Sequence, residues 1–211
     1  MNTNNILNYL NTKQPAEPKK LIQFLYILCK GIMGGTLISL ACIVSSKYDH
    51  PELIFPVGLI CVVYSKSYLY TGCVGHCKIN MKLITVLLGN LVGCIICVLS
   101  TKYIYILDDV NIIGVNKYQE PFLVCFVSSM FCGILMCVAT SINKNKNILC
   151  IVFCVAAFVI CGLDHSIANT FYLLCYKVDV RTLGLISISV VGNGIGAKMV
   201  YTTYSMKSGD L

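Results

Sequence analysis

Residues 161–174 read CGLDHSIANTFYLL, and they place Asp164, His165 and Asn169 inside an otherwise apolar part of the chain. Residues 148–160, directly before this stretch, contain no charged side chain. An uninterrupted helix has no need for such a cluster, because each buried polar group costs free energy unless it finds a partner. The stretch therefore indicates an interrupted helix whose polar groups serve a purpose.

The composition indicates an integral membrane protein. Of the 211 residues, 57% are hydrophobic and 12% are charged, and the mean hydropathy is +0.78. A soluble domain carries about 25% charged residues, so this chain lacks the charge that would cover a surface in water. The net charge of +7 comes from basic residues that flank apolar runs. That pattern is typical of membrane topology and gives no reason to expect a nucleic-acid partner.

Six apolar segments are long enough to cross a bilayer, which takes about 20 residues. Six crossings place both termini on one side, and the lysine-rich loops put that side in the cytoplasm. We therefore expect a multi-pass protein of the cell membrane, with a cytoplasmic arm (1–19), a six-span domain (20–206) and a cytoplasmic tail (207–211). The predicted spans are residues 20–45, 53–77, 82–104, 121–142, 147–176 and 182–204.

The third and sixth spans carry the same short motif, which indicates an internal repeat. Residues 89–93 read GNLVG and residues 192–196 read GNGIG, and each motif follows a span with signs of interruption. Three spans per repeat force the two halves into opposite orientations, which is the pattern of an inverted-repeat transporter or channel. A second explanation stays open, because glycines in such a motif also let two helices pack closely.

The interrupted helices predict how the polar cluster is used. Irregular backbone survives at membrane depth only where protein or a water-filled cavity satisfies it, and the side-chain amides of Asn90 and Asn193 suit that task. The N-terminus of a half-helix presents the positive end of its dipole, which favours an anion. We therefore expect an all-α membrane protein whose second and fifth helices are broken around an anion path.

These residues resemble the formate/nitrite transporter family over residues 20–205. Residues 162–170, GLDHSIANT, are similar to the family motif Gly-aromatic-Glu-His-Ser-(Val/Ile)-Ala-Asn-Met. The resemblance implies an aquaporin-like channel domain of six helices, assembly as a homo-pentamer in the lipid bilayer, and passage of a small monovalent anion rather than enzyme catalysis. It implies formate as the first expectation, with nitrite and hydrosulfide as alternatives, accompanied by protons, and no cofactor.

The resemblance also implies roles for individual residues. His165 corresponds to the central pore histidine, and Thr71 to the residue that faces it from the second-span loop. The polar residues expected along the pore are His165, Thr71, Asn169, Asn90 and Asn193. The expected outer constriction is Phe55 and Phe158, and the expected inner one is Leu59, Leu69 and Tyr70.

The chain departs from the family pattern at several of these positions. Asp164 stands where the family has Glu, and we expect it to support the loop. Lys117 corresponds to the family's outer-vestibule lysine only if the loop is shifted by a few residues. Lys66 stands where the family has a small residue, and it is either a snorkelling or paired lysine or an extra cation that attracts anions. In the fourth span, Ser128 or Ser129 replaces an Asn.

Two chemical questions stay open at this point. Histidine changes its protonation near physiological pH, so His165 either attracts the anion as an imidazolium or hands it a proton. A membrane thiol-redox protein is the alternative from another class. It would use either Cys94 and Cys97, which have redox-pair spacing, or Cys73 and Cys77. The group Cys73, His76 and Cys77 lacks a fourth ligand, so we expect no metal site.

Overall fold

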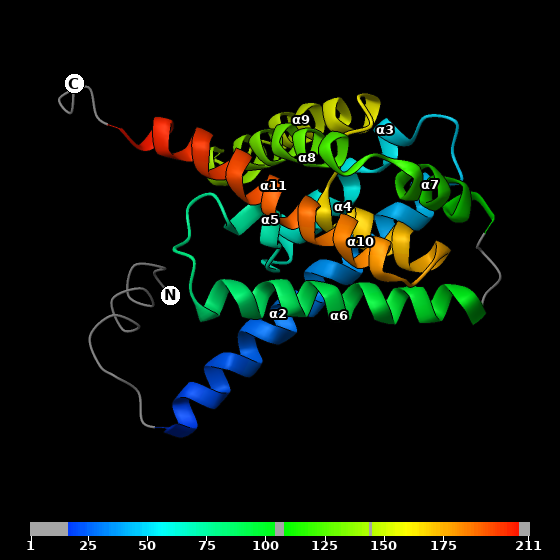
Figure 1. Ribbon diagram of the computed structural model, residues 1–211. Coiled ribbons are helices and arrows are strands. Elements are labelled where there is room, and N and C mark those ends of the chain that lie inside the picture. The colour runs from blue at the N-terminus through cyan, green and yellow to red at the C-terminus, as the bar shows by residue number, and fades with distance from the viewer. Residues whose placement is uncertain (1–16, 104–107, 144, 207–211) are drawn as a thin grey trace.

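The computed structural model describes residues 17–103, 108–143 and 145–206, and Figure 1 shows their arrangement. Residues 1–16 of the expected arm and the whole expected tail, 207–211, lie outside the described residues. Residues 17–19 already belong to the first helix, α2. The described residues form helices joined by short loops.

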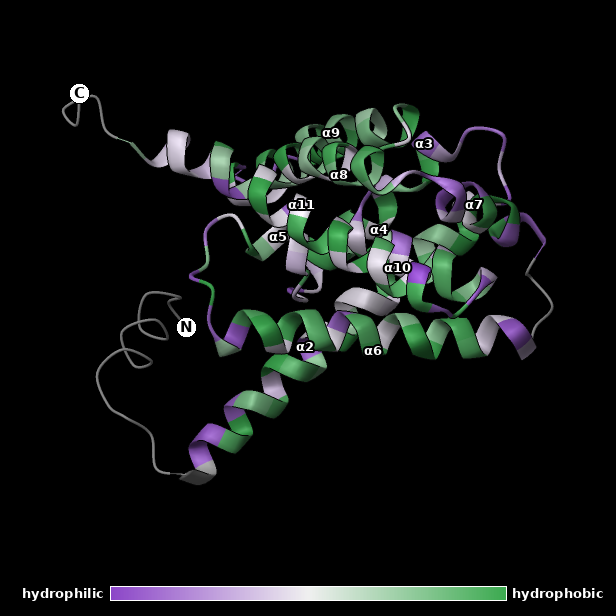
Figure 2. Cartoon of the chain, in the orientation of Figure 1, coloured by the Kyte–Doolittle hydropathy of each residue, from purple (hydrophilic) through white to green (hydrophobic). Residues whose placement is uncertain are grey.

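Among the described residues, four helices are long and apolar enough to cross a bilayer. Their exposed surfaces are also apolar: on the third span, Leu88, Val92, Ile95 and Leu99 are all at least 40% exposed. Figure 2 shows hydrophobic colour along these helices and hydrophilic colour gathered at loops and helix ends. The four helices are α2 (Glu17–Ser45), α6 (Met81–Tyr103), α8 (Phe122–Cys137), which continues as the π-helical turn η1 (Val138–Ile142), and α11 (Val180–Ser205).

The second and fifth spans are broken, as the sequence predicts. The second consists of α3 (Pro51–Ile54), α4 (Pro56–Tyr64) and α5 (Tyr70–Cys73). The fifth consists of α9 (Ile148–Ile160) and α10 (Ser166–Tyr176). Neither span is a single rod, so each exposes helix ends in the interior of the molecule.

Both breaks begin with the same helix ending. After α4, the N–H groups of Lys66 and Ser67 donate to the carbonyls of Val63 and Val62, and after α9, those of Gly162 and Leu163 donate to Val159 and Phe158. This pair of bonds is the Schellman ending, which needs a residue with positive φ. Gly162 supplies it at φ 63°, and Lys66 supplies it at φ 54°. The breaks are thus built into the backbone of both halves.

The two halves run in opposite directions across the molecule. Figure 1 shows α2 and α6 running from left to right, whereas α8 and α11 run from right to left. Within each half the two long helices touch backbone to backbone through glycine. A Cβ on Gly35 of α2 would strike the carbonyl of Asn90, and a Cβ on Gly133 of α8 would strike that of Asn193. The glycine-asparagine motif therefore serves close helix packing within an inverted repeat.

One helix was not expected from the sequence. The segment Asp108–Gln119 was predicted to be a loop, but it forms α7, which packs against α10 at Gly114, next to Tyr172 and Tyr176. Only Val110 and Gly114 of this helix are buried, so its sequence lacks the apolar periodicity that would have predicted a helix. The two acidic residues in its first turn suit the positive end of the helix dipole.

The glycine contacts lead to a stability prediction. Gly133→Leu should lower the free energy of unfolding by at least about 1–3 kcal/mol, because the new side chain meets backbone that cannot yield. Thermal unfolding of the purified protein in detergent measures the change. Gly72→Ala is the control, since a Cβ there meets only the Thr140 side chain at an ordinary 3.5 Å. Equal melting temperatures for the two variants would contradict this account of the packing.

Candidate functional site

Asn90 of α6 holds the broken loop of the second span. Its Oδ1 accepts a hydrogen bond from the backbone N–H of Tyr70, at 2.8 Å. Its Nδ2 donates to the carbonyls of Tyr68 and Gly31, both at 2.8 Å. The side chain is fully buried, so this one amide joins the loop, the start of α5 and helix α2.

Asn193 of α11 does the same for the fifth span. Its Oδ1 accepts from the N–H of Ser166 at 2.8 Å, and its Nδ2 donates to the carbonyls of Ser129 and Asp164, at 2.7 and 2.8 Å. It is also fully buried. The structure therefore places both asparagines behind the broken loops, with their amides engaged by backbone. A direct contact of either amide with an anion stays a prediction.

His165 and Thr71 come together where the two breaks meet. Thr71 Oγ1 lies 2.9 Å from His165 Nε2, and both residues are about 1% exposed. His165 is the N-cap of α10, and its Nδ1 accepts from the backbone N–H of Ala168 at 3.2 Å. Since Nδ1 accepts, the neutral ring carries its proton on Nε2 and donates to Thr71. The threonine hydroxyl proton is then free to point elsewhere.

A phenylalanine covers the imidazole, and a second one packs against the first. The Phe158 ring, from α9, stacks on His165 with centroids 5.7 Å apart and an interplanar angle of 16°. Phe55, at the junction of α3 and α4, meets Phe158 edge to face with centroids 5.5 Å apart. The structure thus brings together the two residues predicted to form the outer constriction, and it stacks one of them, Phe158, on the central histidine.

The residues predicted for the inner constriction are all buried in the same hydrophobic core. Leu59 belongs to α4, Leu69 precedes α5 and Tyr70 opens it. The Tyr70 hydroxyl donates to the carbonyl of Val190, at 3.1 Å. That bond ties the first half of the repeat to α11 of the second half and fixes the direction of the tyrosine ring.

Asp164 lies at the centre of a polar network on the other side of the loop. Its Oδ1 accepts from Asn169 Nδ2 at 2.6 Å and from Lys117 Nζ at 2.8 Å. Its backbone N–H donates to Ser128 Oγ, at 3.0 Å. Lys117 also donates to the carbonyl of Gly162, at 2.7 Å. Asn169 is thereby turned toward the loop, and Lys117 reaches the broken span despite its shifted place in the sequence.

Glu120 completes this network, and sequence reasoning missed it. Lys117 Nζ lies 3.2 Å from Glu120 Oε1. Burial raises the pKa of the Glu120 carboxyl, and Lys117 only partly opposes this. Burial works against a charged Lys117, but Asp164 and Glu120 outweigh it and raise the pKa of the ammonium group. The sequence did offer one signal: Lys117 and Glu120 are three residues apart across the end of α7, a spacing that lets the two side chains meet.

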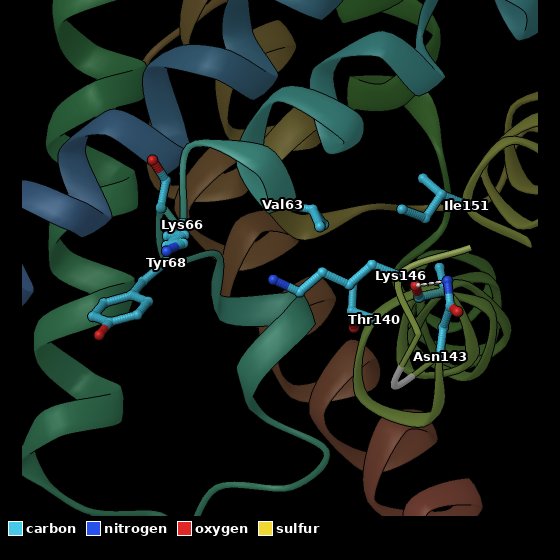
Figure 3. A pocket seen from close by; sticks show the side chains of 9 residues that line it. Val63, Lys66, Tyr68, Thr140, Asn143, Lys146 and Ile151 are labelled. Carbon is cyan, nitrogen blue, oxygen red and sulfur yellow. Dashed lines mark hydrogen bonds between the residues drawn. The ribbon is translucent and has the colours of Figure 1, made fainter. Parts of the chain in front are cut away.

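Lys66 lies away from this network, at the break after α4. It lines a pocket of about 260 Å³ together with Tyr68, Thr140, Asn143 and Lys146, and Figure 3 shows these side chains around the space. Lys146 shares the unusual backbone of Lys66, with φ 51°. Lys30 is engaged differently, since its Nζ donates to the carbonyl of Ser65 at 3.2 Å.

The cysteine pair that suggested redox chemistry is packed in the core. Cys94 is fully buried and Cys97 is 5% exposed. The Cys94 thiol lies 3.5 Å from the carbonyl of Ile167, and the Cys97 thiol lies 3.8 Å from that of Thr36. Reactive thiols need exposure and a neighbouring positive charge. These two cysteines behave as small apolar residues instead.

Comparison with known proteins decides the family. The sequence pattern of the family described as formate/nitrite transporter matches residues 8–206 of this chain. The chain belongs to the formate/nitrite transporter family. It is therefore a multi-pass membrane protein of an anion-channel family and not an enzyme, as the motif in residues 162–170 suggests.

Individual relatives and structures agree with this assignment. A formate-nitrite transporter from Plasmodium ovale is 27% identical over 79% of this chain and 69% of its own length, and one from Plasmodium malariae is 26% identical over 56% and 48%. Formate-nitrite transporter 3 of Toxoplasma gondii is 24% identical over 62% of this chain, which spans about a third (31%) of that protein.

Solved structures show the fold. A channel described as an FNT family ion channel superposes with a TM-score of 0.74 at 21% identity, covering 87% of this chain and 91% of the other. A pentameric formate channel with formate bound gives 0.72 at 21% identity, covering 86% and 96%. The predicted all-α, aquaporin-like architecture is confirmed.

The asparagine contacts lead to the second prediction. Asn193→Leu removes three buried hydrogen bonds and leaves the Ser166 N–H and two carbonyls without their partner, so it should lower the free energy of unfolding by about 3 kcal/mol or more. Asn116→Leu, on the exposed side of α7, is the control. Thermal unfolding in detergent gives both values. If the two variants melt together, Asn193 does not hold the loop.

Proposed function

We propose that this protein is a channel for a small monovalent anion, with formate as the first candidate. The contact between Thr71 and His165, 2.9 Å apart beneath the Phe158 ring, is the observation that carries the proposal. It joins the two broken spans at one point, and it is buried. A path through that point is narrow, apolar at its rim and polar at its centre.

The physical problem at such a point is desolvation. An anion that leaves water between Phe55 and Phe158 loses its hydration shell, and an isolated charge in an apolar medium is very costly. Two donors can turn to the anion and offset this cost: the Thr71 hydroxyl, whose proton is free, and the His165 Nε2–H, which exchanges its contact with Thr71 Oγ1 for one with the anion. The N-terminus of the eleven-residue helix α10 adds its positive dipole end at the same place. Together they favour a single negative charge.

The tautomer of His165 decides between the two roles considered for it. Its Nδ1 accepts the N–H of Ala168, so a proton on Nδ1 would break the N-cap of α10 and leave that N–H unpaired. A neutral imidazole that gave away its Nε2 proton would become an imidazolate. We therefore favour His165 as a hydrogen-bond donor to the passing anion over His165 as a proton donor.

The choice of anion follows from size and charge. Formate, nitrite and hydrosulfide all carry one negative charge on a few atoms, so each suits a short gap between aromatic rings. Formate stands first because the solved formate channel, with formate bound, shares this fold over 86% of the chain. Lactate is bulkier and serves as a test of the gap.

Assembly and orientation follow as parts of the same proposal. The solved formate channel is pentameric, and the exposed apolar side chains of α6 suit a lipid or subunit contact. The start of α2 and the end of α11 lie on one side of the molecule (Figure 1), opposite to α7. Because lysines gather toward that side, we propose that both termini are cytoplasmic. By analogy with the solved formate channel, we propose a homo-pentamer in the cell membrane.

Anion flux into liposomes tests this function. We expect uptake of formate, nitrite and hydrosulfide by stopped-flow measurement, with lactate and chloride much slower. Thr71→Val removes one hydroxyl donor at constant shape, and a hydrogen bond to a charged group is worth about 1.5–3 kcal/mol, so flux should fall roughly 10- to 100-fold. Thr203→Val is the control, since that hydroxyl bonds only within its own helix.

Two results would contradict the proposal. The first is the absence of flux for all the small anions in correctly assembled protein. The second is a Thr71→Val variant that conducts as well as Thr203→Val, because the buried hydroxyl would then have no contact with the anion.

The inner pocket gives a prediction of its own. If Lys66 attracts anions toward the pore, Lys66→Met should lower formate flux several-fold at low salt, and the loss should shrink as added salt screens the charge. Lys20→Met, an exposed lysine near the start of α2, is the control. A loss that is independent of ionic strength would assign Lys66 a structural role in the loop instead.

A further inference from the structure

Lys117, Glu120 and Asp164 form a triad beside the broken fifth span, and its charges do not balance. Lys117 Nζ lies 2.8 Å from Asp164 Oδ1 and 3.2 Å from Glu120 Oε1. The Asp164 side chain is fully buried, and those of Lys117 and Glu120 are 15% and 25% exposed. With both acids ionised, one positive charge faces two negative ones. The triad then carries a net charge of −1, with one carboxylate fully buried and the other two groups mostly buried.

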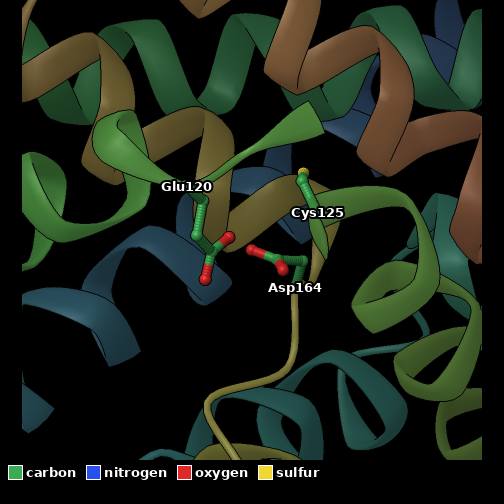
Figure 4. A group of neighbouring side chains, drawn as sticks. All are labelled: Glu120, Cys125 and Asp164. Carbon is green, nitrogen blue, oxygen red and sulfur yellow. The ribbon is translucent and has the colours of Figure 1, made fainter. Parts of the chain in front are cut away.

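Each carboxylate of the triad also has an oxygen without a partner. Asp164 Oδ2 and Glu120 Oε2 are both buried, and neither accepts a hydrogen bond from any residue that the structure describes. Figure 4 shows the two carboxylates facing one another, with an oxygen of each pointing toward the other group. One oxygen from each lies within 4.8 Å of the other and of the Cys125 thiol. Two ionised carboxylates in this arrangement repel one another, and a single proton between them relieves the repulsion.

We propose that Glu120 and Asp164 share one proton and form, with Lys117, a proton-binding site at the outer entrance of the pore. In this state the triad is neutral: one ammonium, one carboxylate and one carboxylic acid. The acid proton gives an otherwise unpartnered carboxylate oxygen a hydrogen bond. That the passing anion senses this site rests on the function proposed above, whereas the proton-binding site itself does not.

The other charged and titratable groups nearby do not neutralise the pair. Arg181 of α11 donates to the backbone carbonyls of Tyr118 and Glu120 and lies over the Phe122 ring. On α8, Cys125 offers only a thiol. Within the described residues, Lys117 is thus the one cation bonded to the two carboxylates.

Three further groups near the triad are engaged elsewhere. His165 turns its ring toward Thr71 and Ala168. Lys177 pairs with Asp179, whose carboxylate also accepts from the Tyr118 hydroxyl. None of these contacts supplies a proton or a second cation to Glu120 or Asp164.

A metal ion is the other cation that such ligand types attract, and the geometry disfavours it. Glu120, Cys125 and Asp164 supply three ligand types, but the Lys117 ammonium already bonds an oxygen of each carboxylate. A second full positive charge would have to sit against that ammonium. A proton between the oxygens adds no such conflict, because it forms a short covalent bond with one of them.

The raised pKa of Glu120 has the sign that this site requires. Burial raises the pKa of its carboxyl and Asp164 adds to the rise, while Lys117 acts in the other direction. A carboxyl with a raised pKa keeps its proton to a higher pH than an exposed one. The neutral triad is therefore the form at lower external pH, and the form with a charge of −1 appears as the pH rises.

The charge of the triad matters to an anion. Asp164 is the residue before His165, and Lys117 also bonds the carbonyl of Gly162 in the same loop. An incoming anion would pass this loop before it reaches the phenylalanines. A net negative triad would repel it, whereas the protonated triad would not. Entry from the outer side should therefore become faster as the external pH falls through the pKa of the Glu120 carboxyl.

Infrared difference spectroscopy of the full-length protein in liposomes tests the proton directly. A carboxylic-acid C=O band should appear as the pH is lowered, and Glu120→Gln should remove it, while Glu52→Gln, at an outer acid that pairs with His50, should leave it unchanged. Lys117→Met should move the titration upward by about 1–3 pH units, because an opposite charge at this distance lowers a carboxyl pKa by that amount. A wild-type spectrum without this band, or one that Glu120→Gln does not alter, would overturn the proposal.

Flux measurements separate this site from the channel function. External pH should control formate uptake in the wild type and in Glu52→Gln, and Glu120→Gln should flatten that dependence while uptake persists. A titrating band without any anion flux would refute the proposed function and leave the proton site standing. Anion flux without a titrating band would refute the proton site and leave the proposed function standing.

Discussion

The fold depends on two asparagines that pair the backbone N–H and C=O groups left free where two helices are interrupted. A helix that stops inside a bilayer leaves N–H and C=O groups without water, and each costs several kcal/mol if it stays unpaired. Asn90 and Asn193 each make three hydrogen bonds, two to a broken loop and one to a carbonyl of the neighbouring long helix, with two N–H donors and one accepting oxygen. No apolar side chain can do this. The interruption, and with it the buried polar centre, exists because these amides satisfy it.

The position of the histidine follows from those loops. Asn193 accepts the N–H of Ser166, the first residue of α10, and so fixes the residue before it as the N-cap. His165 Nδ1 then accepts the capping hydrogen bond, and Nε2 points across to Thr71. Thr71 lies in α5, whose start Asn90 holds. Each half of the repeat contributes one partner to the contact. The chemistry at the centre is thus a consequence of how the two halves are tied.

The repeat and the breaks could be predicted from sequence because they depend on local patterns. Glycine beside asparagine in two spans, and polar residues inside apolar segments, indicate that helices are interrupted there and that side chains pair the exposed backbone groups. The outer network could not be predicted in the same way. Helix α7 is short and half of its residues are polar or charged, so its contact with α10 at Gly114 leaves no periodic signal. Glu120 gains its meaning only when the fold brings Asp164 to the same lysine.

The two helix endings differ in one respect, and the difference points to a use for Lys66. Gly162 adopts a positive φ without steric cost, whereas Lys66 adopts it with a Cβ that clashes in that region, at a cost of about 1–2 kcal/mol. A glycine at position 66 would make the same turn and avoid that cost. The lysine side chain, through its ammonium group or its methylene chain, must therefore contribute something at this position that a glycine would not. Lys146, with the same backbone, lines the same pocket. If the protein is the anion channel proposed above, two cations there would raise the local concentration of anions at the inner end of the proposed pore, and this is the contribution we assign to Lys66.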